Sequence, residues 1–161
     1  MPSSVSSRRK QAGASPVRRT WSVSIYCRHQ GAVLVRHSPL GIWLPVGGEI
    51  TANETPFEAA QRVLREETGF THEVIFPAIH KVTGAPPGLL LYEEHEAGEK
   101  GVHLNFAFLT EVPSKRITPN DEYLGVLWVR SVSEIPDACP VNVREALPYA
   151  LTAGRERILP S

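Results

Sequence analysis

The chain has 161 residues, 42% of them hydrophobic and 21% charged, with a formal net charge of zero. This length and composition are typical of one globular domain and give no overall attraction to nucleic acid or to anionic membranes. No apolar run approaches the roughly 20 residues of a membrane-spanning helix, so we expect neither a membrane nor a stable nucleic-acid partner.

Residues 1–20 are rich in serine, arginine and alanine and lack hydrophobic periodicity. We interpret them as a disordered basic tail before one domain at 21–161, although such a start also faintly resembles an organelle transit peptide. Five of the 17 basic residues lie in the first 19 positions, where no acid occurs, so the domain itself is acidic. Cys27 and Cys139 match no metal-ligand spacing, and we expect reduced thiols in a cytoplasmic protein.

The first part of the domain predicts a β-hairpin followed by a glycine-containing loop. Ser22–Cys27 alternates with period two and Ala32–Val35 is a short β-branched run, with a turn at residues 29–31 between them. Trp43-Leu44-Pro45 and Gly47-Gly48 then predict a loop that has the conformational freedom of glycine.

A helix is predicted from Pro56 to about Thr68. Thr55 is placed as the N-cap, Pro56 at the first helical position and Glu58 at the third, which is the pattern of a capping box. Apolar residues follow at helical spacing, and Gly69 is the expected C-terminal stop.

The second half of the chain predicts three strands and a final helix. The strands are expected near His72–Phe76, Val102–Leu109 and Tyr123–Val129, with a long glutamate-rich loop at Ala85–Gly101 and a helix at Val143 to about Leu151. Asn142 and Glu145 are expected to cap that helix. The order of elements indicates an α/β fold with helices packed on a mixed sheet.

The predicted helix carries the chemistry. Glu66 and Glu67 are adjacent carboxylates in its last turn, where the helix dipole disfavours anions by up to about 1 kcal/mol each. A bound cation would reverse this penalty, and hard oxygen ligands suit Mg²⁺ or Mn²⁺. Arg62 can hold Glu66 or pair with Glu54, and the glycines before the helix bring backbone close. The alternative is an ordinary solvated helix face with i,i+4 ion pairs.

The stretch Gly48–Phe70 closely resembles the Nudix box, G-x5-E-x7-R-E-U-x-E-E-x-G-U, where U is apolar, and matches eight of its nine defined positions. The resemblance implies an α/β/α sandwich with a mixed central sheet, and hydrolysis of a nucleoside diphosphate linked to another moiety. It also implies that Glu66 and Glu67 are metal ligands, that Glu54 and Arg62 shape the site, and that the Gly47 carbonyl completes the metal shell.

The departure from the box is Val63, where the family has a glutamate that serves as metal ligand or general base. Valine offers no lone pairs, so another carboxylate has to substitute, or the domain binds a nucleotide without cleaving it. Glu122 is the leading substitute. Weaker candidates lie in the glutamate-rich loop: Glu93, Glu94 and Glu96.

The sequence gives few indications of the substrate, which we expect to be a small nucleotide or nucleotide sugar. Pro86 lies 16 residues past Phe70, a spacing found in relatives that cleave ADP-ribose. Aromatic side chains could stack on a base, although core packing competes with that role: Trp21, Trp43, Tyr92, Phe106 and Trp128. A homodimer is possible, and a third hypothesis is a structural domain whose basic tail binds a partner protein.

Overall fold

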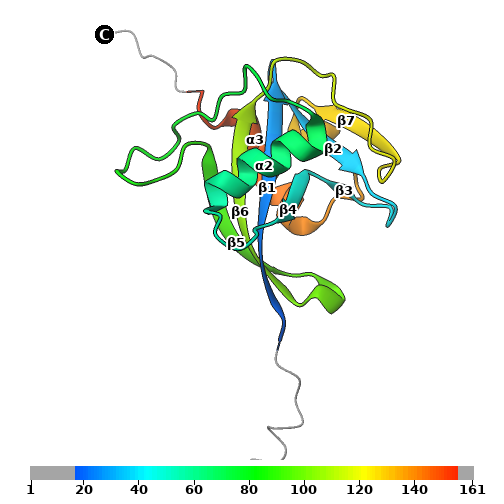
Figure 1. Cartoon of the computed structure of the whole chain (residues 1–161). Coiled ribbons are helices and arrows are strands. Elements are labelled where there is room, and N and C mark those ends of the chain that lie inside the picture. Colours follow the sequence, from blue (N-terminus) through cyan, green and yellow to red (C-terminus); the bar gives the residue numbers. More distant parts are fainter. Residues whose placement is uncertain (1–16, 156–161) are drawn as a thin grey trace, which may run out of the picture.

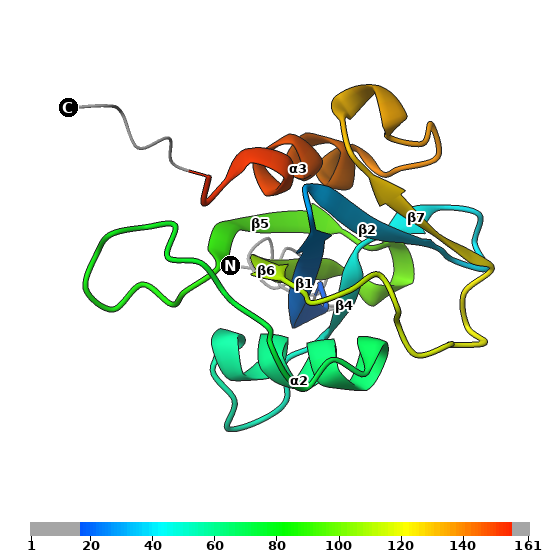
Figure 2. The same cartoon turned by 90° about the horizontal axis from the view of Figure 1, so that it is seen from above.

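The structure is a computed structural model and describes residues 17–155. Seven strands form one sheet, helix α2 covers one face, and helix α3 covers the other (Figures 1 and 2). The strands are β1 (Arg19–His29), β2 (Ala32–His37), β3 (Trp43–Leu44), β4 (Val46–Glu49), β5 (Leu89–Glu96), β6 (Val102–Glu111) and β7 (Gly125–Val129). The helices are α2 (Pro56–Thr68) and α3 (Val141–Thr152), with short 3₁₀ turns at Gly98–Lys100 and Val132–Glu134.

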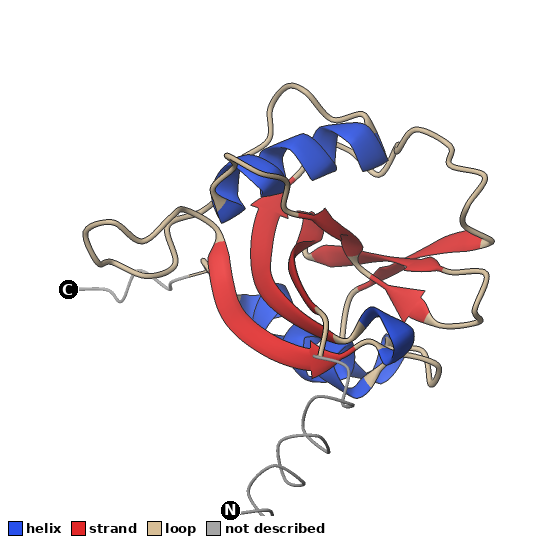
Figure 3. Cartoon of the chain, turned by 60° about the horizontal axis from the view of Figure 1, so that its bottom comes forward, coloured by secondary structure: helices blue, strands red, loops and turns tan. Residues whose placement is uncertain are grey.

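Strand β1 is the centre of the sheet. It pairs in parallel with β6 along its length, and antiparallel with β2 and β4. A two-residue turn joins β1 to β2, and both of its residues, Gln30 and Gly31, have positive φ, as hairpin turns that follow strand twist require. Strand β7 pairs with β2, and β5 pairs antiparallel with β6, forming the long curved pair of strands in Figure 3. The sheet is therefore mixed, as the sequence predicts.

The two faces of the sheet bury two separate clusters of apolar side chains. On the α2 face, Val23 and Ile25 of β1 and Phe108 of β6 pack against Val63 and Leu64. On the α3 face the cluster contains Tyr26, Val33, Val35, Leu109, Val129, Val143, Ala146 and Leu147. Alternate residues of each strand point to opposite faces, so period two in the sequence produces the α/β/α layers.

Arg28 attaches the end of α3 to the sheet. The residue is 1% exposed, and its guanidinium donates to Glu111 Oε1 at 2.6 Å and to the carbonyls of Ala150 and Ala153, both at 2.8 Å. The last carbonyls of a helix have no partners within the helix, and a cation near them is favourable. This buried charge is therefore well compensated.

Several predicted elements are confirmed and two are wrong. The hairpin, the capped helix and the strand from Val102 are all present. No strand forms at His72–Phe76, where only a bridge joins Ile75 to Glu111, because Glu73 adopts φ 58° and interrupts the extended backbone. The predicted loop at 85–101 contains β5, whose half-buried residues alternate with exposed ones.

Three smaller expectations also differ from the structure. Gly47 and Gly48 lie in strand β4 and not in a loop. Helix α3 begins after Pro140 without a side-chain cap, so Asn142 is free to bond elsewhere. Most of the predicted tail at 1–20 lies outside the described residues, and Arg19 and Thr20 begin β1.

Both cysteines are buried free thiols. Within residues 17–155, no helix combines the length and apolarity needed to cross a bilayer.

Candidate active site

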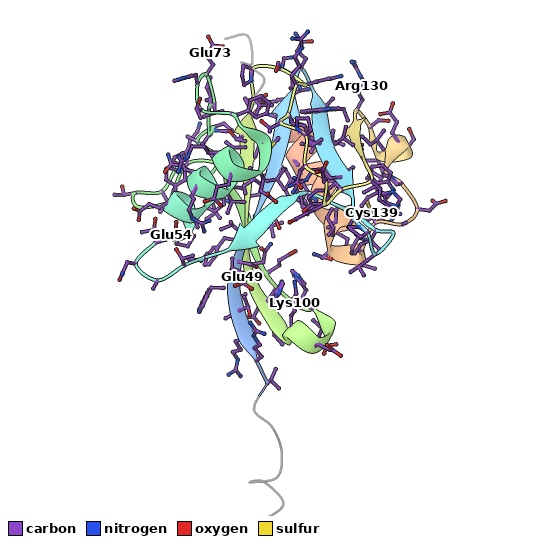
Figure 4. The ribbon with its side chains drawn as sticks, turned by 45° about the vertical axis from the view of Figure 1, so that its right-hand side comes forward. Glu49, Glu54, Glu73, Lys100, Arg130 and Cys139 are labelled. Carbon is purple, nitrogen blue, oxygen red and sulfur yellow. The ribbon has the colours of Figure 1, made fainter. Side chains whose placement is uncertain are left out.

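The loop before α2 fixes Glu54 at the entrance to the helix. Glu54 Oε1 accepts hydrogen bonds from the backbone N–H of Thr51 at 2.9 Å and from its hydroxyl at 2.7 Å. The helix then starts at a complete capping box, in which Thr55 and Glu58 bond each other's backbone N–H. In Figure 4, Glu54 lies on this loop, and Glu49 lies below it at the end of β4. Local sequence signals therefore set the position of Glu54.

Arg62 connects Glu54, the end of β4 and Glu66. It donates to Glu54 Oε2 at 2.6 Å, to Glu54 Oε1 at 3.0 Å, to the Glu49 carbonyl at 2.8 Å and to Glu66 Oε2 at 3.0 Å. The two predicted roles of Arg62 are thus both realised. Its hydrogen bonds, followed by those from Thr51, lower the pKa of Glu54 to about 2, and the bond to Glu54 raises the pKa of Arg62.

Glu67 points away from this network, toward a second arginine. Its Oε1 lies 3.2 Å from Arg36 Nη2, and its Oε2 accepts a long hydrogen bond of 3.4 Å from Asn120 Nδ2. Glu66 is the more exposed of the two carboxylates, at 57% against 23%. A bound cation was the expected compensation for these two adjacent negative charges. In the structure each carboxylate has its own arginine, which already supplies part of it.

Arg36 lies on β2 and is 1% exposed. Its guanidinium carbon lies 3.7 Å from the ring centre of Tyr123, and no described side chain or backbone group accepts a hydrogen bond from its Nε or Nη1. A pocket of about 230 Å³ adjoins it, lined also by Thr118, Asn120 and Tyr123. Sequence reasoning missed this residue, although an arginine in an otherwise apolar strand is a usable signal.

Val63 occupies the position at which the box has its missing glutamate. The side chain is 2% exposed and faces Gly48, where a Cβ would lie 2.8 Å from Val63 Cγ2. A longer residue at either position would separate α2 from β4. Val63 is therefore part of the core.

The Gly47 carbonyl is free of the ladder between β1 and β4. The Ile50 N–H donates to the Trp21 carbonyl, and the register pairs Ser24 with Gly47. Because hydrogen-bonded and non-hydrogen-bonded pairs alternate in an antiparallel ladder, Ser24 and Gly47 form a non-hydrogen-bonded pair. The Gly47 carbonyl therefore accepts no hydrogen bond from β1.

The loop that carries Glu122 reaches this site. Asn120 donates to Glu67 and accepts from the Glu122 backbone N–H at 3.0 Å, and the Glu122 side chain is exposed. The weaker substitutes lie on β5. There Glu93 bonds Asn105 and Asn142, and Glu94 bonds the Tyr92 hydroxyl at 2.7 Å. Within the described residues, no hydrogen bond joins Glu93 or Glu94 to α2, so Glu122 is better placed than either of them.

A polar cluster on the α3 face lies beside Gly47 and was not predicted. Asn105, 2% exposed, bonds the hydroxyls of Ser22 and Ser24 and the carboxylate of Glu93, which also accepts from Asn142 at 3.0 Å. Its members come from β1, β5, β6 and α3, so no local spacing reveals them. Nearby, burial and then His95 lower the pKa of His103.

The aromatic candidates separate into two groups. Trp21 stacks on Phe106 at 5.9 Å between ring centres, with Tyr92 beside them. Trp21 and Phe106 line an open pocket of about 420 Å³ on the α2 face, next to Thr51 and Glu54. By contrast, Trp43 stacks on His37 and Trp128 packs against the α2-side core. Trp21 and Phe106 are therefore the aromatic candidates that line this pocket.

A family model described as NUDIX domain matches residues 16–160. The chain belongs to the Nudix family. A search of curated proteins finds none that matches the chain.

Solved structures share the Nudix fold. A hydrolase of the Nudix family from Clostridium perfringens is 20% identical over 84% of this chain and 97% of its own, with a TM-score of 0.70. A MutT protein from Methanosarcina mazei Go1 is 19% identical, covering 85% and 96%, with a TM-score of 0.63. An ADP-ribose pyrophosphatase from Streptococcus suis 89-1591 is 16% identical, covering 86% and 93%, with a TM-score of 0.55. At these identities the likeness shows the α/β/α sandwich alone.

Proposed function

We propose that this Nudix protein is a metal-dependent hydrolase that cleaves the diphosphate bond of a nucleoside diphosphate linked to another moiety. The observation that carries the proposal is the arrangement around Arg62, which ties Glu54 and Glu66 to the end of β4 through the Glu49 carbonyl. The pyrophosphatase among the structures with this fold supports the same class of bond.

The donor set fits Mg²⁺ or Mn²⁺. Glu66, Glu67 and the Gly47 carbonyl would offer hard oxygens, which these ions prefer. Among residues 17–155, no group of three or more His, Cys, Asp or Glu side chains is already arranged around one point, so the carboxylates have to turn toward the ion. When bound, such an ion would neutralise charge on the phosphoryl oxygens and acidify the attacking water.

The protein's own groups supply the positioning. Arg62 holds Glu66 to the strand through the Glu49 carbonyl, and Glu54 keeps the guanidinium in place. Val63 is buried against Gly48 and has no proton-accepting group, so the proton acceptor has to be another residue. We assign that role to Glu122, whose exposed carboxylate sits on the loop attached to Glu67 through Asn120. The half-exposed Trp21 ring would stack on the aromatic part of a substrate.

The test is hydrolysis of a panel of nucleoside diphosphate sugars, ADP-ribose and nucleoside triphosphates with Mg²⁺ or Mn²⁺, with phosphorus products separated by chromatography. Glu67→Gln and Glu122→Gln are expected to lower kcat by about 10²-fold or more, as loss of a ligand or general base does. Glu145→Gln, an exposed residue of α3, is the matched control and should leave kcat unchanged. No product with either ion across the panel would refute the proposal.

The sealed position of Val63 favours one alternative, a Nudix domain that binds a nucleotide without turnover. Calorimetry separates the two functions. Micromolar binding of a panel member without product would support the binder. Cleavage that Glu67→Gln abolishes would exclude it.

A further inference from the structure

The two fully buried arginines of the β1–β2 hairpin differ in how many of their N–H donors have a hydrogen-bond acceptor. Arg28 donates to Glu111 and to two backbone carbonyls at the end of α3. Arg36 has one carboxylate acceptor within the described residues, Glu67 Oε1 at 3.2 Å, and its Nε and Nη1 are buried without partners. A buried guanidinium with most of its donors unused is costly, and native proteins rarely keep one without a function.

The surroundings of Arg36 indicate what that function is. The face of its guanidinium rests on the Tyr123 ring, so a cation–π contact retains it whether or not Glu67 is bound. Glu67 is held from the other side by Asn120, on the same loop as Tyr123. Arg36 therefore has one permanent partner and one partner that can leave. The partner that can leave is a carboxylate proposed above to bind a metal ion.

A carboxylate shared between a guanidinium and a divalent cation brings three positive charges close together. In a partly buried site, the Coulomb repulsion between the guanidinium and the ion costs more free energy than is saved by fixing the Glu67 side chain before the ion binds. We propose that Arg36 is an internal counter-ion that occupies Glu67 in the metal-free protein and lowers the affinity of the site for its cation. The inference rests on the proposed metal site at Glu66 and Glu67.

Mn²⁺ affinity tests this directly, measured by calorimetry or by the spin-resonance signal of free Mn²⁺, without substrate. Arg36→Met keeps the apolar stem and removes the charge, and it should bind Mn²⁺ at least about tenfold more tightly than the unmodified chain. Arg36→Lys keeps the charge and should bind as the unmodified chain does. Arg28→Met is the matched control. It removes an equally buried arginine whose acceptors lie on β6 and α3, so it should lower stability without changing Mn²⁺ affinity.

A metal-free measurement keeps the inference testable if Arg36→Met does not fold. Glu67→Gln should lower the melting temperature in the presence of a chelator, because it leaves the buried guanidinium without its charged acceptor. Glu66→Gln should have a smaller effect, because Arg62 retains Glu54. Equal melting temperatures for the two variants would contradict the pairing on which the inference depends.

The outcomes separate the two proposals. Tighter Mn²⁺ binding by Arg36→Met, together with unchanged binding by Arg28→Met, supports the counter-ion. Equal or weaker binding by Arg36→Met, or tighter binding by Arg36→Lys, overturns it while the metal site stands. If no protein binds Mn²⁺, or if Glu67→Gln leaves binding unchanged, the proposed site at Glu67 fails and the counter-ion fails with it.

Discussion

The side chain of Val63 packs directly on the backbone of Gly48, and this contact joins the α2 helix to β4. A Cβ at position 48 would lie 2.8 Å from Val63 Cγ2 and 3.3 Å from Cγ1. The box glycine and the unusual valine are therefore complementary in size. Val63, which departs from the family pattern, therefore removes a carboxylate and also fills the space between α2 and β4.

Val63→Glu should consequently destabilise the metal-free protein. The new carboxylate would enter an apolar cluster without a partner, at a cost of roughly 3 kcal/mol or more. Mn²⁺ should restore part of the loss, because the glutamate would then have a cation beside it. Urea denaturation with Mn²⁺ and with a chelator measures both effects. The isosteric Val63→Thr should be insensitive to Mn²⁺, and full stability of Val63→Glu in chelator would show that position 63 opens to solvent.

Gly48→Ala tests the same contact from the strand side. The added methyl group has to displace Val63, which should lower the free energy of unfolding by about 1–3 kcal/mol. Gly125→Ala is the control, because nothing lies within 4 Å of its Cβ position. Thermal and urea unfolding of the two variants should differ clearly, and equal stabilities would mean that α2 can shift without cost.

Glu54 should contribute to acid stability. Its pKa of about 2 lies below the ordinary value of about 4.3, so the folded chain binds this proton less readily than the unfolded chain does. The stability from the Arg62 and Thr51 hydrogen bonds is therefore present above about pH 4.3 and disappears as the pH falls through about 2. In urea titrations at a series of pH values, Glu54→Gln should show a shallower decline over this window. Glu145→Gln should follow the unmodified chain, and a parallel decline for Glu54→Gln would contradict the prediction.

Removing Arg28 should destabilise the fold more than any surface arginine does. Arg28→Met leaves Glu111 and two helix-end carbonyls without their donor, with an expected loss of about 3–5 kcal/mol in the free energy of unfolding. Arg130 lies exposed near the end of β7, away from α2 in Figure 4, and Arg130→Met should change stability by less than about 0.5 kcal/mol. Comparable losses in the two variants would show that α3 is held by its apolar face alone.

The elements that could be predicted are those whose signals are local. The α2 helix has its cap, proline, apolar stripe and terminal glycine within 15 residues, and the structure reproduces each of them. Strand β5 was not predicted because its glutamates, and the prolines and glycine before it, are typical of a loop, whereas pairing with β6 makes it a strand. The run at 72–76 has strand-like composition, but composition does not report the positive φ of Glu73.

In the site, too, the contacts that could be predicted are those between residues close together in the sequence. The pairing of Arg62 with Glu54 and Glu66 follows from helix spacing and the loop before the helix. Arg36 meets Glu67 only because β2 lies under the end of α2, and the Asn105 cluster is assembled from four elements. Such partners have no fixed separation in the sequence, so tertiary packing alone reveals them.

The glutamates of β5 have a consequence for self-association. Within the described residues, β5 is the last strand on its side of the sheet, so one row of its backbone donors and acceptors has no neighbouring strand. Such an edge is a template for pairing with another molecule, and negative charges along it repel an identical edge. The exposed carboxylates of Glu94 and Glu96 therefore protect this edge, and replacing both residues with glutamine would remove the protection.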